Sequence, residues 1–93
     1  MEKERVKGIL ESILFASEKP LSTERLTVIF EDAYTKEEVQ SVLEELSQEL
    51  SSTENRGFKL EQVAGGWQFR TKDENNSWVK KLESIRPIRI SPT

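Results

Sequence analysis

GFKLEQVAGGWQFRT, residues 57–71, is the stretch that decides the fold. Apolar and polar residues alternate on both sides of a glycine pair, which is typical of two half-buried strands joined by a tight turn. Taking Gly65-Gly66 as the turn predicts that the strands pair Ala64 with Trp67, Gln62 with Phe69 and Glu61 with Arg70. This register places four apolar side chains on one face, Phe58, Leu60, Trp67 and Phe69, and a Glu61–Arg70 ion pair on the other.

Two helical segments open the chain. The first is predicted over about residues 4–17, because apolar residues recur there at helical spacing, and Pro20 follows its end. The second is short, with Ser22 as its N-cap, and it stops near residues 31–32. We expect Leu21 to pack against Leu26 at its start. The residues that we expect this helix to bury are Leu26, Ile29 and Phe30.

The third helix, predicted over residues 35–50, carries the clearest signals. Thr35 and Glu38 match the capping box, and Tyr34 can pack against Val39 across the first turn. Its apolar stripe repeats at 3.6-residue spacing, as expected for a helix that packs on a core. The residues of this stripe are Val39, Val42, Leu43, Leu46 and Leu50.

Beyond the hairpin, the pattern predicts one more short helix over about residues 73–83 that buries Trp78, Val79 and Leu82. Residues 86–93 are expected to form an extended tail. Three helices followed by a β-hairpin is the order of a winged helix, so we predict an α+β winged-helix domain over residues 1–85. A small α+β domain of another topology is the alternative.

Composition limits the chemistry available to the chain. Its 93 residues suffice for one domain, and they include neither cysteine nor histidine. The sequence offers no phosphate-binding glycine loop and no metal-ligand cluster, so we expect no catalytic, cofactor or metal site. No apolar run approaches the ~20 residues of a membrane span, and no export signal opens the sequence. We therefore expect a cytoplasmic location.

Charge is distributed unevenly along the chain. Residues 1–55 carry six Lys/Arg and thirteen Asp/Glu, a net of −7, whereas residues 56–93 have a net of +4. The third helix, which enters the major groove in DNA-binding winged helices, carries five glutamates against one lysine. Such a helix repels the phosphate backbone, so we expect no sequence-specific DNA binding. Weak phosphate contacts remain open for a basic group beyond the hairpin turn: Arg70, Lys72, Lys80 and Lys81.

Several short motifs together resemble one known family. They are Leu14-Phe15-Ala16-Ser17 with Pro20-Leu21-Ser22, Gly57-Phe58-Lys59-Leu60 with Val63-Ala64-Gly65-Gly66-Trp67, Arg70-Thr71, and Arg89-Ile90-Ser91. The chain is similar in these motifs to the N-terminal domain of segregation and condensation protein B, over about residues 5–92. The hairpin with its Gly-Gly pair is the most specific part of the resemblance.

The resemblance implies a non-enzymatic subunit of a bacterial condensin-like complex that acts in chromosome condensation and partition. Members of the family have two winged-helix domains, form homodimers, and bind a kleisin subunit (segregation and condensation protein A) that bridges the heads of an SMC ATPase. This sequence ends where a second domain would begin, so we interpret residues 86–93 as a linker and expect homodimerisation to be the main activity of this domain. The resemblance also implies a location in the cytoplasm at the nucleoid.

Four apolar residues are candidates for a dimer interface because no helical stripe or strand face accounts for them: Phe15, Val28, Ile88 and Ile90. Lone exposed apolar residues are common, so each of the four also has an ordinary explanation, but a contiguous apolar patch often marks an interface. Two other functions stay open. One is a winged-helix DNA-binding transcription regulator lacking its effector domain, and the other is a winged helix that binds protein in another complex.

Overall fold

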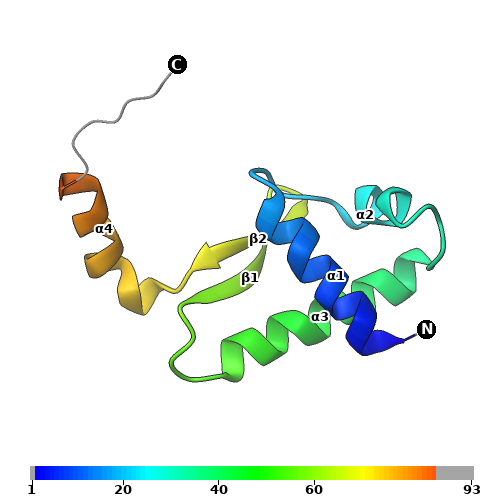
Figure 1. The fold of residues 1–93 in the computed structure, drawn as a ribbon, viewed down its shortest axis with the longest axis horizontal. Coiled ribbons are helices and arrows are strands. Elements are labelled where there is room, and N and C mark those ends of the chain that lie inside the picture. The colour runs from blue at the N-terminus through cyan, green and yellow to red at the C-terminus, as the bar shows by residue number, and fades with distance from the viewer. Residues whose placement is uncertain (1, 86–93) are drawn as a thin grey trace, which may run out of the picture.

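The computed structural model describes residues 2–85, and within them three helices precede a hairpin and a fourth helix follows it (Figure 1). The order is α1 (Lys3–Ala16), α2 (Thr23–Ile29), α3 (Lys36–Ser52), β1 (Phe58–Val63), β2 (Gly66–Thr71), the 3₁₀ turn η1 (Asp73–Asn75) and α4 (Asn76–Ile85). This confirms the predicted α+β winged helix. The predicted tail, residues 86–93, lies outside the described residues.

The helix boundaries follow from capping. The Ser22 hydroxyl accepts a hydrogen bond from the Arg25 amide and begins α2. At α3 the predicted capping box is present, because Thr35 Oγ1 accepts from the Glu38 amide while Glu38 Oε1 accepts from the Thr35 amide. Both loops before these helices are therefore fixed by polar contacts that the sequence already indicates.

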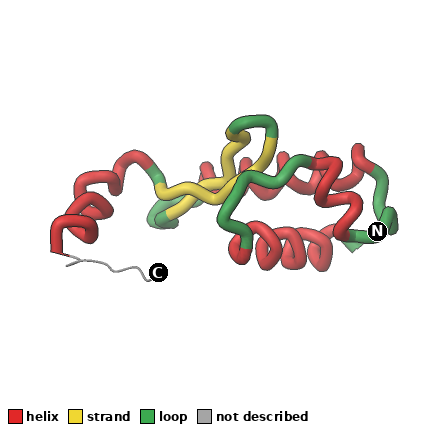
Figure 2. The backbone as a smooth tube through the Cα atoms, turned by 90° about the horizontal axis from the view of Figure 1, so that it is seen from above, coloured by secondary structure: helices red, strands yellow, loops and turns green. Residues whose placement is uncertain are grey.

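The core lies between α1, α3 and the inner face of the hairpin. All five residues of the predicted α3 stripe are buried in it. The other buried apolar residues are Val6, Leu10, Leu14, Leu26, Leu60 and Trp67. Figure 2 shows the strands next to this helical layer, with α4 outside it at the far end. Residues 2–71 thus share one hydrophobic core, and we call this part of the chain the body.

The predicted turn is wrong by one position, and the strand pairing is therefore displaced by two residues. The turn is Ala64-Gly65, and both residues have positive φ, 51° and 79°, as a type I′ turn requires. The strands consequently pair Val63 with Gly66 and Leu60 with Phe69. Parity is conserved in this shift, so the four predicted apolar residues still share one face, and Glu61 still reaches Arg70, now diagonally, at 3.4 Å.

Gly66 lies in β2 and outside the turn, because its backbone packs directly against the loop that follows α1. A Cβ at Gly66 would lie 2.9 Å from backbone atoms of Pro20 and Leu21. Leu21 forms a short antiparallel bridge to Trp67, with the Trp67 amide donating to the Leu21 carbonyl at 2.7 Å and the reverse bond at 3.0 Å. The loop after α1 therefore adds a third, one-residue strand to the hairpin, and only glycine lets the two backbones approach.

Two predictions of burial are also wrong. In α2, Ile29 is exposed, because the inward face carries Thr23 and Leu26 instead. Thr23 is buried and its hydroxyl donates to Gln40 Oε1 of α3 at 2.8 Å. In α4, none of Trp78, Val79 and Leu82 is buried, because the only substantial packing of that helix among the described elements is against η1.

Candidate interaction surfaces

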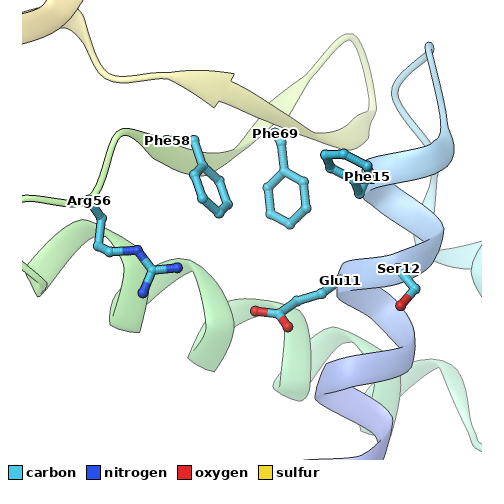
Figure 3. A pocket seen from close by; sticks show the side chains of 6 residues that line it. All are labelled: Glu11, Ser12, Phe15, Arg56, Phe58 and Phe69. Atoms are coloured by element: carbon cyan, nitrogen blue, oxygen red, sulfur yellow. The ribbon is translucent and has the colours of Figure 1, made fainter.

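An aromatic groove, formed by Phe15, Phe58 and Phe69, lies between the end of α1 and the hairpin (Figure 3). The Phe58 and Phe69 rings meet edge to face, with centroids 5.1 Å apart and planes at 82°. The groove consists of two hollows that share these three rings, with volumes of about 290 and 320 Å³, and both open to solvent. Phe15 is 84% exposed, so the groove offers apolar surface that the body does not use.

Charged side chains of opposite sign edge this groove. In Figure 3 the Glu11 carboxylate of α1 lies below the Phe69 ring, and Arg56 lies at the Phe58 end. The Arg56 guanidinium carbon is 5.6 Å from the centroid of the Phe58 ring. Neither Glu11 nor Arg56 forms an ion pair within residues 2–85. Both charges are available to a molecule that enters the groove.

The local sequence explains why Phe15 faces outward. It follows Leu14, the last buried residue of the α1 stripe, by about 100° around the helix. The other side of the groove comes from the segment after α3. Asn55, with a φ of 68°, turns the chain from α3 into β1, and Arg56 and Phe58 line the groove together with α1. The groove is thus built from two segments that are far apart in sequence.

A second apolar surface lies on the arm, which we define as η1 and α4, residues 73–85. Trp78 is 71% exposed, and Val79, Leu82 and Ile85 are exposed with it. At 100° per residue these four side chains share one side of the helix. In Figure 1 the arm extends away from the body, on the far side of the hairpin from α2. This is an amphipathic helix whose apolar side faces solvent.

The structure brings together only part of the predicted interface. Phe15 is exposed and joins the groove, whereas Val28, which is 68% exposed at the end of α2, does not line it. Ile88 and Ile90 lie outside the described residues. Sequence reasoning missed Phe58 and Phe69 as groove residues because it assigned them wholly to the core. It missed α4 because an apolar stripe has the same spacing whether it is buried or exposed.

The basic group predicted to contact phosphates is divided between two elements. On the hairpin side, Arg70 pairs with Glu61, and the Lys72 ammonium donates to the Thr53 carbonyl at 3.1 Å. On the arm, Lys81 lies over the Trp78 ring at 5.1 Å, and Lys80 is exposed. The weak phosphate contact stays a prediction for these four residues.

Several charged side chains of α3 form ion pairs within the body. Lys7 of α1, only 7% exposed, donates to Glu49 at 2.6 Å, and Lys3 pairs with Glu45 at 3.2 Å. The hydrogen bond to Glu49 raises the pKa of Lys7 above its ordinary value, against the opposing effect of burial. At the other end of the helix, Lys36 donates to Glu24 at 2.6 Å, which lowers the pKa of Glu24 and raises that of Lys36.

The described part of the chain holds no group of three or more acidic, cysteine or histidine residues that could bind a metal ion. Within residues 2–85, no helix has the length and apolar character needed to cross a bilayer. The exposed apolar surfaces described above are the aromatic groove and the arm.

Comparison with known proteins gives a consistent result. The model of the family "Segregation and condensation complex subunit ScpB" matches residues 8–93. Segregation and condensation protein B of Syntrophotalea carbinolica is 36% identical over 91 residues, which are 98% of this chain and 45% of that protein. The protein of the same name from Listeria innocua is 38% identical over 86 residues, or 91% of this chain and 42% of the relative. The chain thus spans less than half the length of these relatives.

Solved structures agree with the sequence matches. A dimer of the ScpB N-terminal domain in complex with a ScpA peptide superposes with a TM-score of 0.75 at 32% identity, over 85% of this chain and 95% of that one. ScpB from Mycobacterium tuberculosis, at 22% identity, gives a TM-score of 0.84 over all of this chain and 56% of that one, which supports the fold.

Proposed function

The chain belongs to the family of the segregation and condensation complex subunit ScpB, and from this we propose that it is a non-enzymatic structural subunit of a bacterial condensin-like complex. In this role it acts in chromosome condensation and partition, in the cytoplasm at the nucleoid. It works by contact, forming a homodimer and binding a kleisin subunit of the ScpA type, through which it meets the heads of an SMC ATPase. The similar ScpB N-terminal domain was solved as a dimer with a ScpA peptide.

One observation of this molecule carries the proposal: a small domain leaves two apolar surfaces uncovered. Phe15 on the body and Trp78 on the arm are both more than two-thirds exposed. Contiguous exposed apolar surface on a small protein usually marks a site of association. A protein whose task is to hold other subunits together needs such surfaces, whereas a catalyst needs an enclosed pocket with reactive groups.

The direct test is the mass of the purified chain in solution, alone and with a kleisin fragment. Light scattering at micromolar concentration should give twice the 10.8 kDa of one chain, and a further increase on addition of the fragment. A mass of one chain up to high micromolar concentration would contradict homodimerisation. A dimer whose mass does not change with the fragment would contradict only the kleisin contact.

The same proposal implies that this domain does not recognise a specific DNA sequence. Gln40, the first side-chain amide on α3, accepts from Thr23 and donates to Glu44 at 3.0 Å, so its orientation is fixed by contacts within the domain. We expect fluorescence anisotropy with random duplexes to show an affinity weaker than ~10⁻⁴ M at physiological salt. Enrichment of a discrete sequence motif with salt-resistant affinity would favour the transcription regulator instead.

A further inference from the structure

The root of the arm is fixed by hydrogen bonds to the body. The Lys72 amide donates to the Gly57 carbonyl at 3.0 Å, and the Lys72 ammonium donates to the Thr53 carbonyl. The next turn begins at once, since the Asn75 amide donates back to the Lys72 carbonyl at 3.0 Å. These bonds set the direction in which α4 leaves the hairpin, and in Figure 1 α4 extends away from α1. None of the arm residues lines the groove of its own chain.

We propose that the arm of one copy of this chain lies in the aromatic groove of a second copy, and that the second arm occupies the first groove in return. The inference rests on the proposed homodimer and names the surfaces that form it. Every chain carries both the arm and the groove. In a dimer with two-fold symmetry, each arm therefore occupies the groove of the other copy, and no arm or groove stays uncovered. An open, head-to-tail use of the same surfaces would instead produce chains of molecules.

The two surfaces match in shape. Trp78, Leu82 and Ile85 form a ridge along α4, about 10 Å long at 1.5 Å per residue. The rings of Phe58, Phe69 and Phe15 line up in a row in Figure 3. The ridge on α4 can therefore pack into the groove beside these rings, in the same way as the side-chain ridge of one helix packs into the groove of another.

The groove also offers a carboxylate to a lysine of the arm. On α4, Lys81 borders the apolar ridge on one side. The groove is lined by Glu11 together with two cations, Arg56 and Arg70. A helix laid in the groove with Lys81 toward α1 brings its ammonium to the Glu11 carboxylate, which forms no ion pair within residues 2–85. This pairing favours the arm of a second copy over an uncharged apolar segment.

The apolar area is sufficient for a stable contact. An aromatic side chain buries roughly 150–250 Å², so Trp78 and Phe15 of two copies contribute roughly 450–800 Å² after their exposed fractions are considered. The aliphatic residues of both arms and the Phe58–Phe69 face add to this. The total approaches the ~1,200–2,000 Å² of a specific protein–protein interface.

Chemical crosslinking tests which surfaces meet. The chain has no cysteine, so Phe15→Cys and Leu82→Cys can each be the only thiol in their copy. When the two variants are mixed and treated with a short bismaleimide, we expect the mixed 15–82 product to exceed the 82–82 product at least fivefold. Predominance of the 82–82 product would overturn the exchange, because it would mean that the two arms pack on each other, while the homodimer itself would stand.

A matched pair of substitutions on the arm supplies the second measurement. Leu82→Asp should shift the 93-residue chain from dimer to monomer in light scattering, whereas Ser84→Asp, on the far side of the same helix, should leave the dimer intact. Because Leu82 is exposed, its replacement should not unfold the body, and circular dichroism can verify this. A Leu82→Asp chain that remains dimeric would overturn the proposal without affecting the homodimer, and a monomeric parent would remove both.

The groove side is tested in the same way. Phe15→Asp should also give a monomer. If it gives instead a dimer that no longer binds the kleisin fragment, the groove is the site of that fragment, and the arm exchange is overturned. Glu11→Lys should weaken the dimer several-fold, and Lys81→Glu added to it should restore the affinity. Absence of any restoration would contradict the predicted charge pairing.

Discussion

The body and the arm of this chain use the same kind of helix with opposite results. In the body, α3 turns an apolar stripe inward and buries all five of its residues. On the arm, α4 carries a stripe at the same spacing and buries none of it. The difference lies in what stands opposite each helix, since α1, α2 and the hairpin cover α3, while among the described elements only η1 packs substantially on α4. Amphipathic spacing therefore predicts a helix with an apolar face, and it does not predict which segment or which molecule covers that face.

The two tryptophans give the strongest test of this contrast. Trp67 of the body is 5% exposed, and Trp67→Ala should reduce the free energy of unfolding by ~3–5 kcal/mol through lost burial and a cavity. Trp78→Ala should change it by less than ~0.5 kcal/mol when measured at concentrations that keep the chain monomeric. Urea titration followed by circular dichroism measures both. Equal losses would mean that α4 packs on the body.

Trp67→Phe is a useful control for the first of these variants. The indole Nε1–H of Trp67 is buried, and among the described residues no group accepts a hydrogen bond from it. Phenylalanine removes this donor and keeps most of the apolar volume, so it should cost clearly less than alanine. Phe69→Ala should cost less than Trp67→Ala, because Phe69 shares the same strand face but is only half-buried.

Glycine substitutions test how tightly the body is assembled. Gly66→Ala should cost ~1–3 kcal/mol, because its Cβ would meet the backbone of Leu21 at 2.9 Å and would push the bridge to Trp67 apart. Gly57→Ala is the matched control, since a Cβ there meets nothing within 4 Å. Thermal unfolding of both variants distinguishes them. A Gly66→Ala variant as stable as the parent would mean that the hairpin can use a different register.

The helix caps provide a smaller effect. Thr35→Ala should destabilise the body by ~1 kcal/mol, because it removes the acceptor for the Glu38 amide in the first turn of α3. Ser77→Ala, at the exposed start of α4, should have no measurable effect on the same unfolding transition. Denaturant titration measures both variants. A neutral Thr35→Ala result would place the start of α3 at another residue.

The smallest expected effect is a dependence of stability on alkaline pH. The raised pKa of Lys7 means that its contact with Glu49 contributes fully to stability at pH values below 10.5, the ordinary lysine value, and is lost as the pH rises through the higher folded-state value. The stability difference between the parent and Lys7→Met should therefore shrink above pH 10.5. Glu49→Gln should reduce this pH dependence, since it removes the main cause of the shift. A constant difference across this range would contradict the contact.

Local sequence determined much of this protein. The capping box of Thr35 and Glu38, the α3 stripe, the order of helices and hairpin, and the shared face of Phe58, Leu60, Trp67 and Phe69 all follow from spacing and residue type. These features depend on interactions within a few residues or on strict periodicity, so they can be read before the chain is folded. Even the ion pair of Glu61 with Arg70 is correct, because the diagonal and the direct neighbour both lie within reach.

Only the tertiary structure decided which glycine made the turn and which stripe stayed exposed. From sequence, Gly65-Gly66 is the better turn, since glycine accepts positive φ without strain and alanine does not. In the fold, Leu21 approaches the backbone of Gly66 so closely that this glycine must stay in the strand, and Ala64 adopts a φ of 51° in its place. The exposure of Phe15 and of the α4 ridge also depends on the tertiary structure, because no segment of the described chain covers them. Burial depends on which distant segment comes near, and a local pattern contains no information about that approach.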